Sequence, residues 1–130
     1  MLSREELIRY NRQIILPNFG IEGQEKLKAA SVLVIGAGGL GIPNLSYLAA
    51  AGVGRIGLVE FDEISLTNLQ RQTIYTTSQT GESKGMSAIA SIKELNPNVK
   101  TQLYETQIDA TNALNIIKSY DVVVDGSDNL

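Results

Sequence analysis

A glycine cluster between two apolar runs is the stretch of this sequence best suited to bind a ligand. Val32–Ile35 is apolar, and Gly36-Ala37-Gly38-Gly39-Leu40-Gly41 follows it directly. A Gly-x-Gly-x-x-Gly turn that opens a helix offers bare main-chain N–H groups and a partial positive charge to a phosphate. The second apolar run, Ile56–Val59, ends on Glu60, close to the spacing at which an acid meets a ribose hydroxyl. The pattern predicts a nucleotide site.

Each glycine has a distinct role in such a turn. Gly36 lets the chain turn sharply off the strand, Gly38 leaves the backbone open to a phosphate, and Gly41 lets the following helix lie close to the strands. That helix is expected over Leu45–Ala51, before Gly52-Val53-Gly54 ends it. The same fingerprint serves NAD, FAD and ATP, and it also occurs in turns that bind nothing. The glycine turn alone therefore does not identify the ligand.

Helical and strand patterns alternate along the remaining chain. Before the glycine cluster we expect a helix capped by Ser3 and running to about Tyr10, a turn bracketed by Gly20 and Gly23, and a helix over Gln24–Ala30. After it we expect a helix over Lys84–Leu95, capped by Ser83, with apolar residues at Met86, Ile89, Ile92 and Leu95. A strand over Val99–Glu105, a helix capped by Asp109 and running to about Lys118, and a buried strand over Tyr120–Val124 should follow.

This alternation predicts an α/β fold, a Rossmann-like doubly wound sheet that is mostly parallel, in the strand order 3-2-1-4. Residues 1–30 form an N-terminal helical extension, and residues 31–130 form the nucleotide-binding domain. A doubly wound sheet normally continues beyond its fourth strand, so we expect either a truncated domain or a partner that covers the open edge.

Composition restricts the chemistry available to this chain. Its 130 residues contain no Cys and no His, which removes disulfides, a Cys/His zinc site, a thiol nucleophile and imidazole acid–base catalysis. The remaining carboxylates, Lys, Arg and hydroxyls suit charge neutralisation around phosphates with a bound metal ion. A net charge of −3 argues against nucleic-acid or membrane binding. Because no long apolar run or leader is evident, we expect a cytoplasmic protein.

Polar residues beyond the second and fourth apolar runs are candidates for ligand contacts. Asn68 and Arg71, in the segment Asn68-Leu69-Gln70-Arg71-Gln72, could bind phosphate or sugar, although an exposed Arg in a loop is commonly only solvated. Lys84 opposes the dipole of the helix that it begins, a conflict that a nearby phosphate would relieve. Asp62, Asp125 and Asp128 could bind Mg²⁺ or belong to ordinary turns.

Taken together, these segments resemble the ThiF/MoeB/HesA family, bacterial relatives of the ubiquitin-activating enzymes, most closely its MoeB-like and ThiF-like members. The matching stretches run in the family's order: Arg9-Tyr10-Asn11-Arg12-Gln13, Gly36 to Gly41, Gly52-Val53-Gly54, Phe61-Asp62, Asn68 to Gln72, Lys84, Asn96-Pro97 and Asp125 to Asn129. The two motifs Asn11-Arg12-Gln13 and Asn68 to Gln72 are far more specific than the glycine turn.

The resemblance implies ATP- and Mg²⁺-dependent adenylation of the C-terminal carboxylate of a ubiquitin-like sulfur-carrier protein with a Gly-Gly terminus, in molybdopterin or thiamine biosynthesis. By position, the resemblance implies that the main chain of Gly36, Gly38, Gly39 and Gly41 surrounds the phosphates. It implies that Glu60 accepts a hydrogen bond from a ribose hydroxyl, with Asp62 nearby. It further implies that Asn68, Arg71 and Lys84 bind the phosphates and that Asp128 binds the metal. Arg12 resembles the arginine that reaches the ATP of a neighbouring subunit, which implies a homodimer.

The sequence also departs from the family pattern. Members usually carry a further sheet that docks the carrier protein, and often Cys-x-x-Cys zinc ligands and a functional cysteine. The resemblance therefore covers the ATP-binding part only. Two alternatives stay open: an NAD(P)-dependent oxidoreductase domain built on the same glycine turn, and a non-catalytic interaction subunit of the same ancestry.

Overall fold

A four-stranded parallel sheet organises the chain. The structure is a computed structural model that describes residues 1–39, 41–66, 69 and 75–126. The strands lie in the order β3-β2-β1-β4, with bounds β1 Ser31–Ile35, β2 Arg55–Val59, β3 Lys100–Tyr104 and β4 Val122–Asp125. In the register of the central strand, Val32 lies opposite Ile56 on one side and Val122 on the other. The predicted parallel sheet and its order are confirmed.

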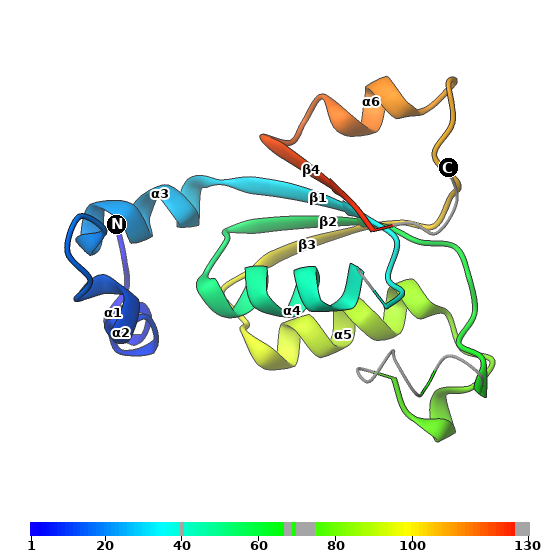
Figure 1. The fold of residues 1–130 in the computed structure, drawn as a ribbon, viewed down its shortest axis with the longest axis horizontal. Helices are drawn as coiled ribbons and strands as arrows, with labels where there is room; N and C mark the ends of the chain where they lie inside the picture. Colours follow the sequence, from blue (N-terminus) through cyan, green and yellow to red (C-terminus); the bar gives the residue numbers. More distant parts are fainter. Residues whose placement is uncertain (40, 67–68, 70–74, 127–130) are drawn as a thin grey trace.

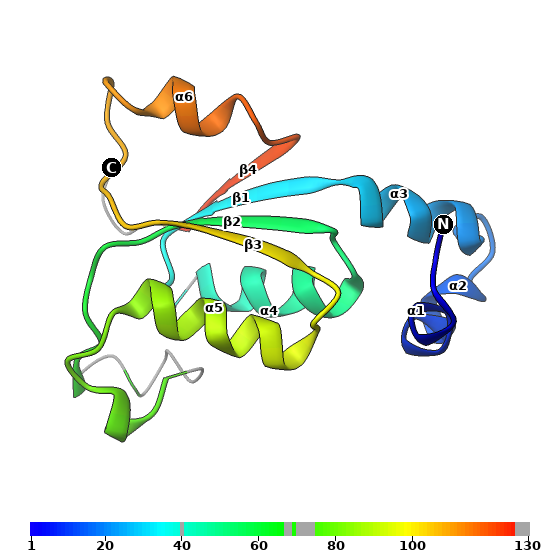
Figure 2. The ribbon, with the colours of Figure 1, turned by 180° about the vertical axis from the view of Figure 1, so that it is seen from behind.

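Helices cover both faces of this sheet, as a doubly wound fold requires. Helix α4 (Gly41–Ala51) and helix α5 (Lys84–Leu95) lie side by side on one face, and the short α6 (Ala113–Ile117) lies on the other (Figures 1 and 2). The larger core joins the sheet to α4 and α5 through buried residues that include Val34, Leu58, Leu45, Ala88 and Ile92. The smaller core, under α6, is formed by Leu33, Val59, Ile116 and Tyr120.

The N-terminal helices lie beyond the amino ends of the strands, at the left of Figure 1. They are α1 (Arg4–Arg9), α2 (Asn11–Ile14) and α3 (Gly20–Ala29), and α3 leads directly into β1. The predicted capping box of Ser3 is present, because its hydroxyl accepts from the Glu6 N–H while the Glu6 carboxylate accepts from the Ser3 N–H.

The predicted turn between Gly20 and Gly23 is wrong, since both residues belong to α3. A Cβ atom built on Gly23 would lie 2.7 Å from the Phe19 ring. Gly23, inside α3, therefore makes room for the ring of Phe19, which lies just before the helix.

Buried and half-buried amide side chains join the N-terminal helices to the C-terminal end of α4. The amide nitrogens of Gln13 and Gln24 donate to the Ala51 carbonyl over 2.7 Å and 2.9 Å. Asn96, just after α5, donates to the Ala49 carbonyl over 2.8 Å and to the Tyr10 hydroxyl over 2.7 Å. The carbonyls that a helix end leaves without partners are thus satisfied by side chains.

The starts of two helices and the burial of one strand also differ from the sequence expectation. Helix α4 begins at Gly41 rather than Leu45, because Pro43 is tolerated in a first helical turn. Helix α6 begins at Ala113, since Asp109 accepts main-chain hydrogen bonds in the turn before it. Strand β4 was expected to be buried, but it lies at the edge of the sheet and Val122 is 52% exposed.

Helix α5 matches its predicted bounds, and the Ser83 hydroxyl accepts from the Met86 N–H as its cap. A short 3-10 helix, η2 (Thr77–Gln79), precedes it. In the described parts of the chain, no helix is both long enough and apolar enough to span a bilayer.

Candidate active site

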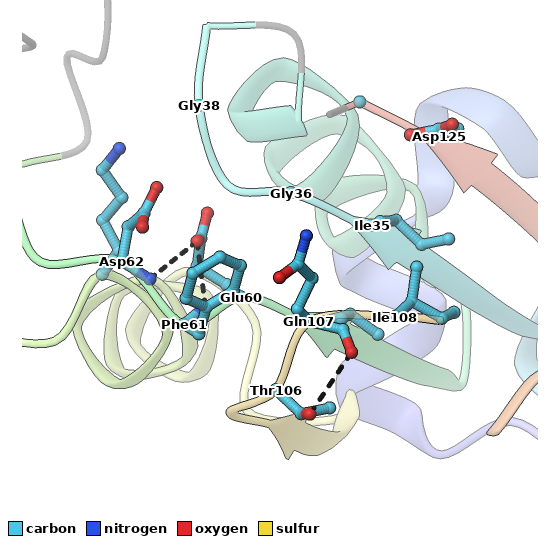
Figure 3. Close-up of a pocket in the computed structure, with 13 residues that line it drawn as sticks. Ile35, Gly36, Gly38, Glu60, Phe61, Asp62, Thr106, Gln107, Ile108 and Asp125 are labelled. Carbon is cyan, nitrogen blue, oxygen red and sulfur yellow. Dashed lines mark hydrogen bonds between the residues drawn. The ribbon is translucent and has the colours of Figure 1, made fainter. Parts of the chain in front are cut away.

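A cavity of about 390 Å³ opens at the carboxyl ends of the strands, beside the point where the chain crosses from one half of the sheet to the other (Figure 3). This is where open α/β sheets bind their ligands. All four strands, or the turns that follow them, contribute to its lining: Ile35, Gly36, Gly38, Val59, Glu60, Phe61, Asp62, Lys84, Thr106, Gln107, Ile108, Asp125 and Gly126.

The glycine turn forms one wall of this cavity. Gly36 has a φ of 93°, which an L side chain rarely adopts, and its N–H donates to the Val59 carbonyl at the end of β2. A Cβ atom on Gly41 would lie 1.7 Å from the Gly36 carbonyl oxygen, so only glycine fits where α4 begins. Among the described residues, nothing accepts a hydrogen bond from the N–H groups of Gly38 and Gly39. Gly38 also lines the cavity, which places its main chain beside a bound ligand.

Glu60 connects the second strand to the glycine turn. Its carboxylate is buried, with one oxygen accepting from the Ala37 N–H over 2.7 Å and the other from the N–H groups of Phe61 and Asp62 over 3.0 Å each. A carboxylate can accept about four hydrogen bonds, so the three donated by described residues leave a capacity for about one more. Glu60 therefore holds the turn in place as well as facing the cavity.

The opposite side of the turn is held by a tyrosine that the sequence analysis did not identify. The Tyr75 hydroxyl donates to the Ala37 carbonyl over 2.8 Å, and the Lys84 carbonyl lies 3.4 Å from the same hydroxyl. Burial raises the pKa of Tyr75 above its ordinary value of 10.0, and the nearby Glu60 carboxylate raises it further. The hydroxyl thus stays protonated and able to donate at neutral pH.

Lys84 brings a positive charge to the cavity wall. It is the first residue of α5, its main-chain N–H donates to the Asp62 carbonyl over 2.9 Å, and the residue is only 6% exposed. Within the described parts of the chain, its ammonium group makes no hydrogen bond or ion pair. A buried ammonium without a partner is costly, and an anionic ligand in the cavity would remove that cost.

Some of the predicted site residues line this cavity, and others do not. Gly36, Gly38, Glu60, Asp62 and Lys84 line the same cavity, as does Asp125. The structure places Gly39 in the turn beside it and Gly41 at the start of α4. The predicted contacts Asn68, Arg71 and Asp128 lie outside the described residues. Arg12 is an exposed residue of α2, a helix that lies beyond the amino ends of the strands, whereas the cavity lies at their carboxyl ends (Figure 1).

The wall formed by Thr106, Gln107 and Ile108 was missed in the sequence analysis. These residues follow β3 and lie opposite the glycine turn (Figure 3). Their types carry no recognisable motif. The predicted parallel order could have located them, because it brings the carboxyl end of β3 to the same edge as those of β1 and β2.

A divalent cation would find oxygen ligands at this edge. The carboxylates of Asp62 and Asp125 line the cavity, and Asp62 is exposed. Over the described residues, no group of three potential metal-ligating side chains occurs. That arrangement fits Mg²⁺ held by one or two carboxylates together with phosphate oxygens, rather than an all-protein metal cage.

Comparison with known proteins identifies the family. The ThiF family description matches residues 10–130. The chain belongs to the ThiF family. Over 127 residues it is 54% identical to a sulfur carrier protein adenylyltransferase of Thermus thermophilus, covering 98% of this chain and 47% of that protein. Over 128 residues it is 52% identical to the probable adenylyltransferase/sulfurtransferase MoeZ of Mycobacterium tuberculosis, covering 98% of this chain and 33% of that protein.

This ThiF-family chain thus spans less than half the length of these two relatives. Among solved structures, E. coli tRNA N6-threonylcarbamoyladenosine dehydratase, TcdA, in complex with ATP, superposes with a TM-score of 0.93. The match covers 99% of this chain and 53% of TcdA at 24% identity, and it establishes the shared fold. The Rossmann-like architecture expected from the sequence is therefore that of the family.

Proposed function

We propose that this chain is the ATP-binding part of an enzyme that adenylates the C-terminal carboxylate of a ubiquitin-like sulfur-carrier protein. Membership of the ThiF family and relatives named as adenylyltransferases support the reaction type. The observation that carries the proposal is the position of Lys84, a buried lysine that lines the same cavity as Gly38. A cation facing bare amides is an arrangement suited to phosphate oxygens.

In this reaction a carboxylate oxygen of the carrier attacks the α-phosphorus of ATP. The bond between that phosphorus and the bridging oxygen breaks, and pyrophosphate leaves with its electrons, so an acyl-adenylate remains. The N–H groups of Gly38 and Gly39 and the ammonium of Lys84 bind the phosphates and offset the charge that develops during transfer. Glu60 accepts a hydrogen bond from a ribose hydroxyl with its remaining hydrogen-bonding capacity. We also propose that the side chains of Asn68 and Arg71 bind the phosphates.

Mg²⁺ belongs to the proposal as a cofactor. Asp128 is its proposed ligand, and the carboxylates of Asp62 and Asp125 lie at the same edge of the sheet as further oxygen donors. When bound, the ion neutralises phosphate charge and orients the leaving pyrophosphate. It requires no histidine or cysteine, and the chain contains neither.

Nucleotide binding separates this proposal from an NAD(P)-dependent oxidoreductase domain. In a thermal-shift titration of the purified chain, we expect ATP with Mg²⁺ to raise the melting temperature and NAD⁺ to leave it unchanged. Stabilisation by NAD⁺ alone would overturn the proposal. The reaction itself is tested by ATP–pyrophosphate exchange, which should depend on an added carrier ending in Gly-Gly. ATP binding without carrier-dependent exchange would instead favour a non-catalytic interaction subunit. A cytoplasmic location is part of the same proposal.

We further propose that the enzyme is a homodimer in which Arg12 serves the ATP of the partner. The position of Arg12 supports this, since it is exposed beyond the amino ends of the strands and far from the cavity of its own chain (Figure 1). In this arrangement the N-terminal helical segment, residues 1–30, forms the dimer contact.

Mixing two inactive variants tests the shared site. We expect Arg12→Ala and Lys84→Ala to lack exchange activity alone, because each removes one cation from every site. After equal mixing and random re-pairing, half of the dimers are mixed and each carries one complete site, so about a quarter of the wild-type activity should return. If mass spectrometry detects mixed dimers but exchange activity does not return, Arg12 does not act across the interface.

A further inference from the structure

The Ala37 backbone of the glycine turn is held by two buried side chains, one on each side. The Glu60 carboxylate accepts from the Ala37 N–H over 2.7 Å, and the Tyr75 hydroxyl donates to the Ala37 carbonyl over 2.8 Å. Ala37 is fully buried, Tyr75 is 4% exposed and Glu60 is 7% exposed. Such short hydrogen bonds in a buried setting fix the orientation of the peptide groups that they contact.

Fixing the Ala37 carbonyl also fixes the next N–H group. The Ala37 carbonyl and the Gly38 N–H belong to one planar peptide, and the described part of the chain contains no cis peptide bond. In a planar trans peptide the C=O and N–H groups point in opposite directions. Because the carbonyl faces Tyr75, the N–H of Gly38 points away from it.

The two sides of this peptide have different surroundings. Tyr75 belongs to the larger hydrophobic core beneath the turn, and among the described residues it is not part of the cavity lining. Gly38 does line the cavity. A carbonyl held toward the core therefore leaves the Gly38 donor directed to the ligand side, before any ligand binds.

We propose that Tyr75 is a positioning residue of the anion site, which aims the Gly38 N–H at a phosphate oxygen by holding the Ala37 carbonyl. The proposal rests on the proposed nucleotide function and adds a residue to it. The weaker approach of the same hydroxyl to the Lys84 carbonyl, at 3.4 Å, places Tyr75 between the glycine turn and the first residue of α5. Tyr75 thus links the two phosphate-facing elements without contacting the ligand.

The test compares ATP with adenosine in the variant Tyr75→Phe. Phenylalanine keeps the ring in the core and deletes only the hydroxyl, so circular dichroism should show an unchanged fold. We expect calorimetric titration with ATP and Mg²⁺ to give an affinity about tenfold weaker than in the wild type, the effect of one hydrogen bond. Adenosine, measured by ligand-observed NMR, should bind equally to both because it carries no phosphate.

Tyr104→Phe is the matched control. It also deletes a partnered tyrosine hydroxyl, which lies 3.0 Å from the Tyr120 hydroxyl and belongs to the smaller core on the other face of the sheet. We expect a similar loss of thermal stability and no change in ATP affinity. Equal loss of ATP affinity in both variants, or an equal loss of ATP and adenosine binding in Tyr75→Phe, would overturn the positioning role.

A measurement on the wild-type chain keeps the test independent of the variant. In ¹⁵N-labelled protein, ATP should shift the Gly38 amide proton resonance strongly and leave that of Gly54, at the opposite end of the sheet, almost unchanged. If ATP binds and the Gly38 resonance does not move, the inference fails while the nucleotide function stands. If ATP does not bind at all, both fail.

Discussion

Glu6 and Lys84 are buried charged residues at opposite ends of the sheet, and they differ in their partners. Glu6, beyond the amino ends of the strands, is 4% exposed and forms an ion pair with Lys28 at 2.8 Å. Lys84, at the carboxyl ends, is 6% exposed, and the described residues give its ammonium no partner. A charge that is fully paired within the chain serves the fold, whereas one left without a partner is available to a ligand.

Helix α4 shows the same difference along its own length. At its C-terminal end, the carbonyls of Ala49 and Ala51 receive side-chain hydrogen bonds from Gln13, Gln24 and Asn96. In the glycine turn just before its first residue, the N–H groups of Gly38 and Gly39 have no acceptor among the described residues. The amino edge of the sheet is thus internally satisfied, and the carboxyl edge keeps its polar capacity for a ligand.

Replacing the buried charge of Lys84 should affect function and spare the fold. We expect Lys84→Met to lower ATP–pyrophosphate exchange by ~10² to 10³, the effect of removing one well-placed charged donor. The free energy of unfolding should stay constant or rise, because the substitution removes a buried charge that has no partner among the described residues. Lys93→Met, at an exposed position of the same helix, is the control and should change neither quantity. A large loss of stability in Lys84→Met would contradict the comparison.

A substitution at the amino edge should have the opposite pattern. Gln24 is completely buried, and Gln24→Met keeps the side-chain length while removing its hydrogen bond to the Ala51 carbonyl. We expect the free energy of unfolding to fall by about 1–3 kcal/mol, since the Gln13 amide also loses one of its two acceptors, the Gln24 side-chain oxygen. Chemical denaturation measures this loss. Exchange activity per folded molecule should be unchanged, and a lower activity would show that the two edges are coupled.

A smaller change at the same edge sharpens the point. Tyr10→Phe removes the hydroxyl that accepts from Asn96, while the Asn96 amide keeps its bond to the Ala49 carbonyl. We expect a loss of about 1 kcal/mol in the free energy of unfolding, the usual value for one buried hydrogen bond. Denaturant titration beside Tyr47→Phe, at an exposed position of α4, would separate this effect from the loss of any tyrosine hydroxyl.

Local signals made much of the fold predictable. Helix α5 agrees with its prediction at both ends because Ser83 caps it and Asn96-Pro97 stops it, and both signals lie in the adjacent sequence. The apolar spacing of that helix was less informative about burial, since Met86 and Leu95 are exposed. Steps of three residues drift by about 60° each around a helix with 3.6 residues per turn, so the row leaves the buried face at its ends.

The remaining features depend on contacts between distant segments. The glycine turn and Lys84 could be proposed as site residues from their types, but the roles of Gln24 and Tyr75 depend on Ala51 and Ala37, which only the folded chain brings near them. The exposure of β4 follows from its place at the edge of the sheet, whereas its apolar sequence suggests a buried strand. Residue type indicates what a side chain can do, and the fold determines which partners it has.

The paired charge at the amino edge predicts a pH dependence of stability. Burial raises the pKa of Glu6, but the hydrogen bonds from Lys28 and Ser3 together lower it by more than burial raises it. The pKa of Glu6 therefore lies below its ordinary value of 4.5. A carboxyl group with a lowered folded-state pKa binds fewer protons in the folded chain than in the unfolded chain. The contribution of Glu6 to the free energy of unfolding is therefore complete above pH 4.5, and it is lost as the pH falls through the folded-state pKa.

Glu6→Gln isolates this contribution. We expect the wild type to be more stable than Glu6→Gln at neutral pH, and the difference in free energy of unfolding to shrink as the pH falls below the ordinary value of 4.5. Glu22→Gln, whose partner Lys26 lies 3.8 Å away at an exposed site, is the control and should show almost no difference at any pH. A Glu6 effect that does not vary with pH would mean that packing, rather than the ion pair with Lys28, stabilises the amino edge.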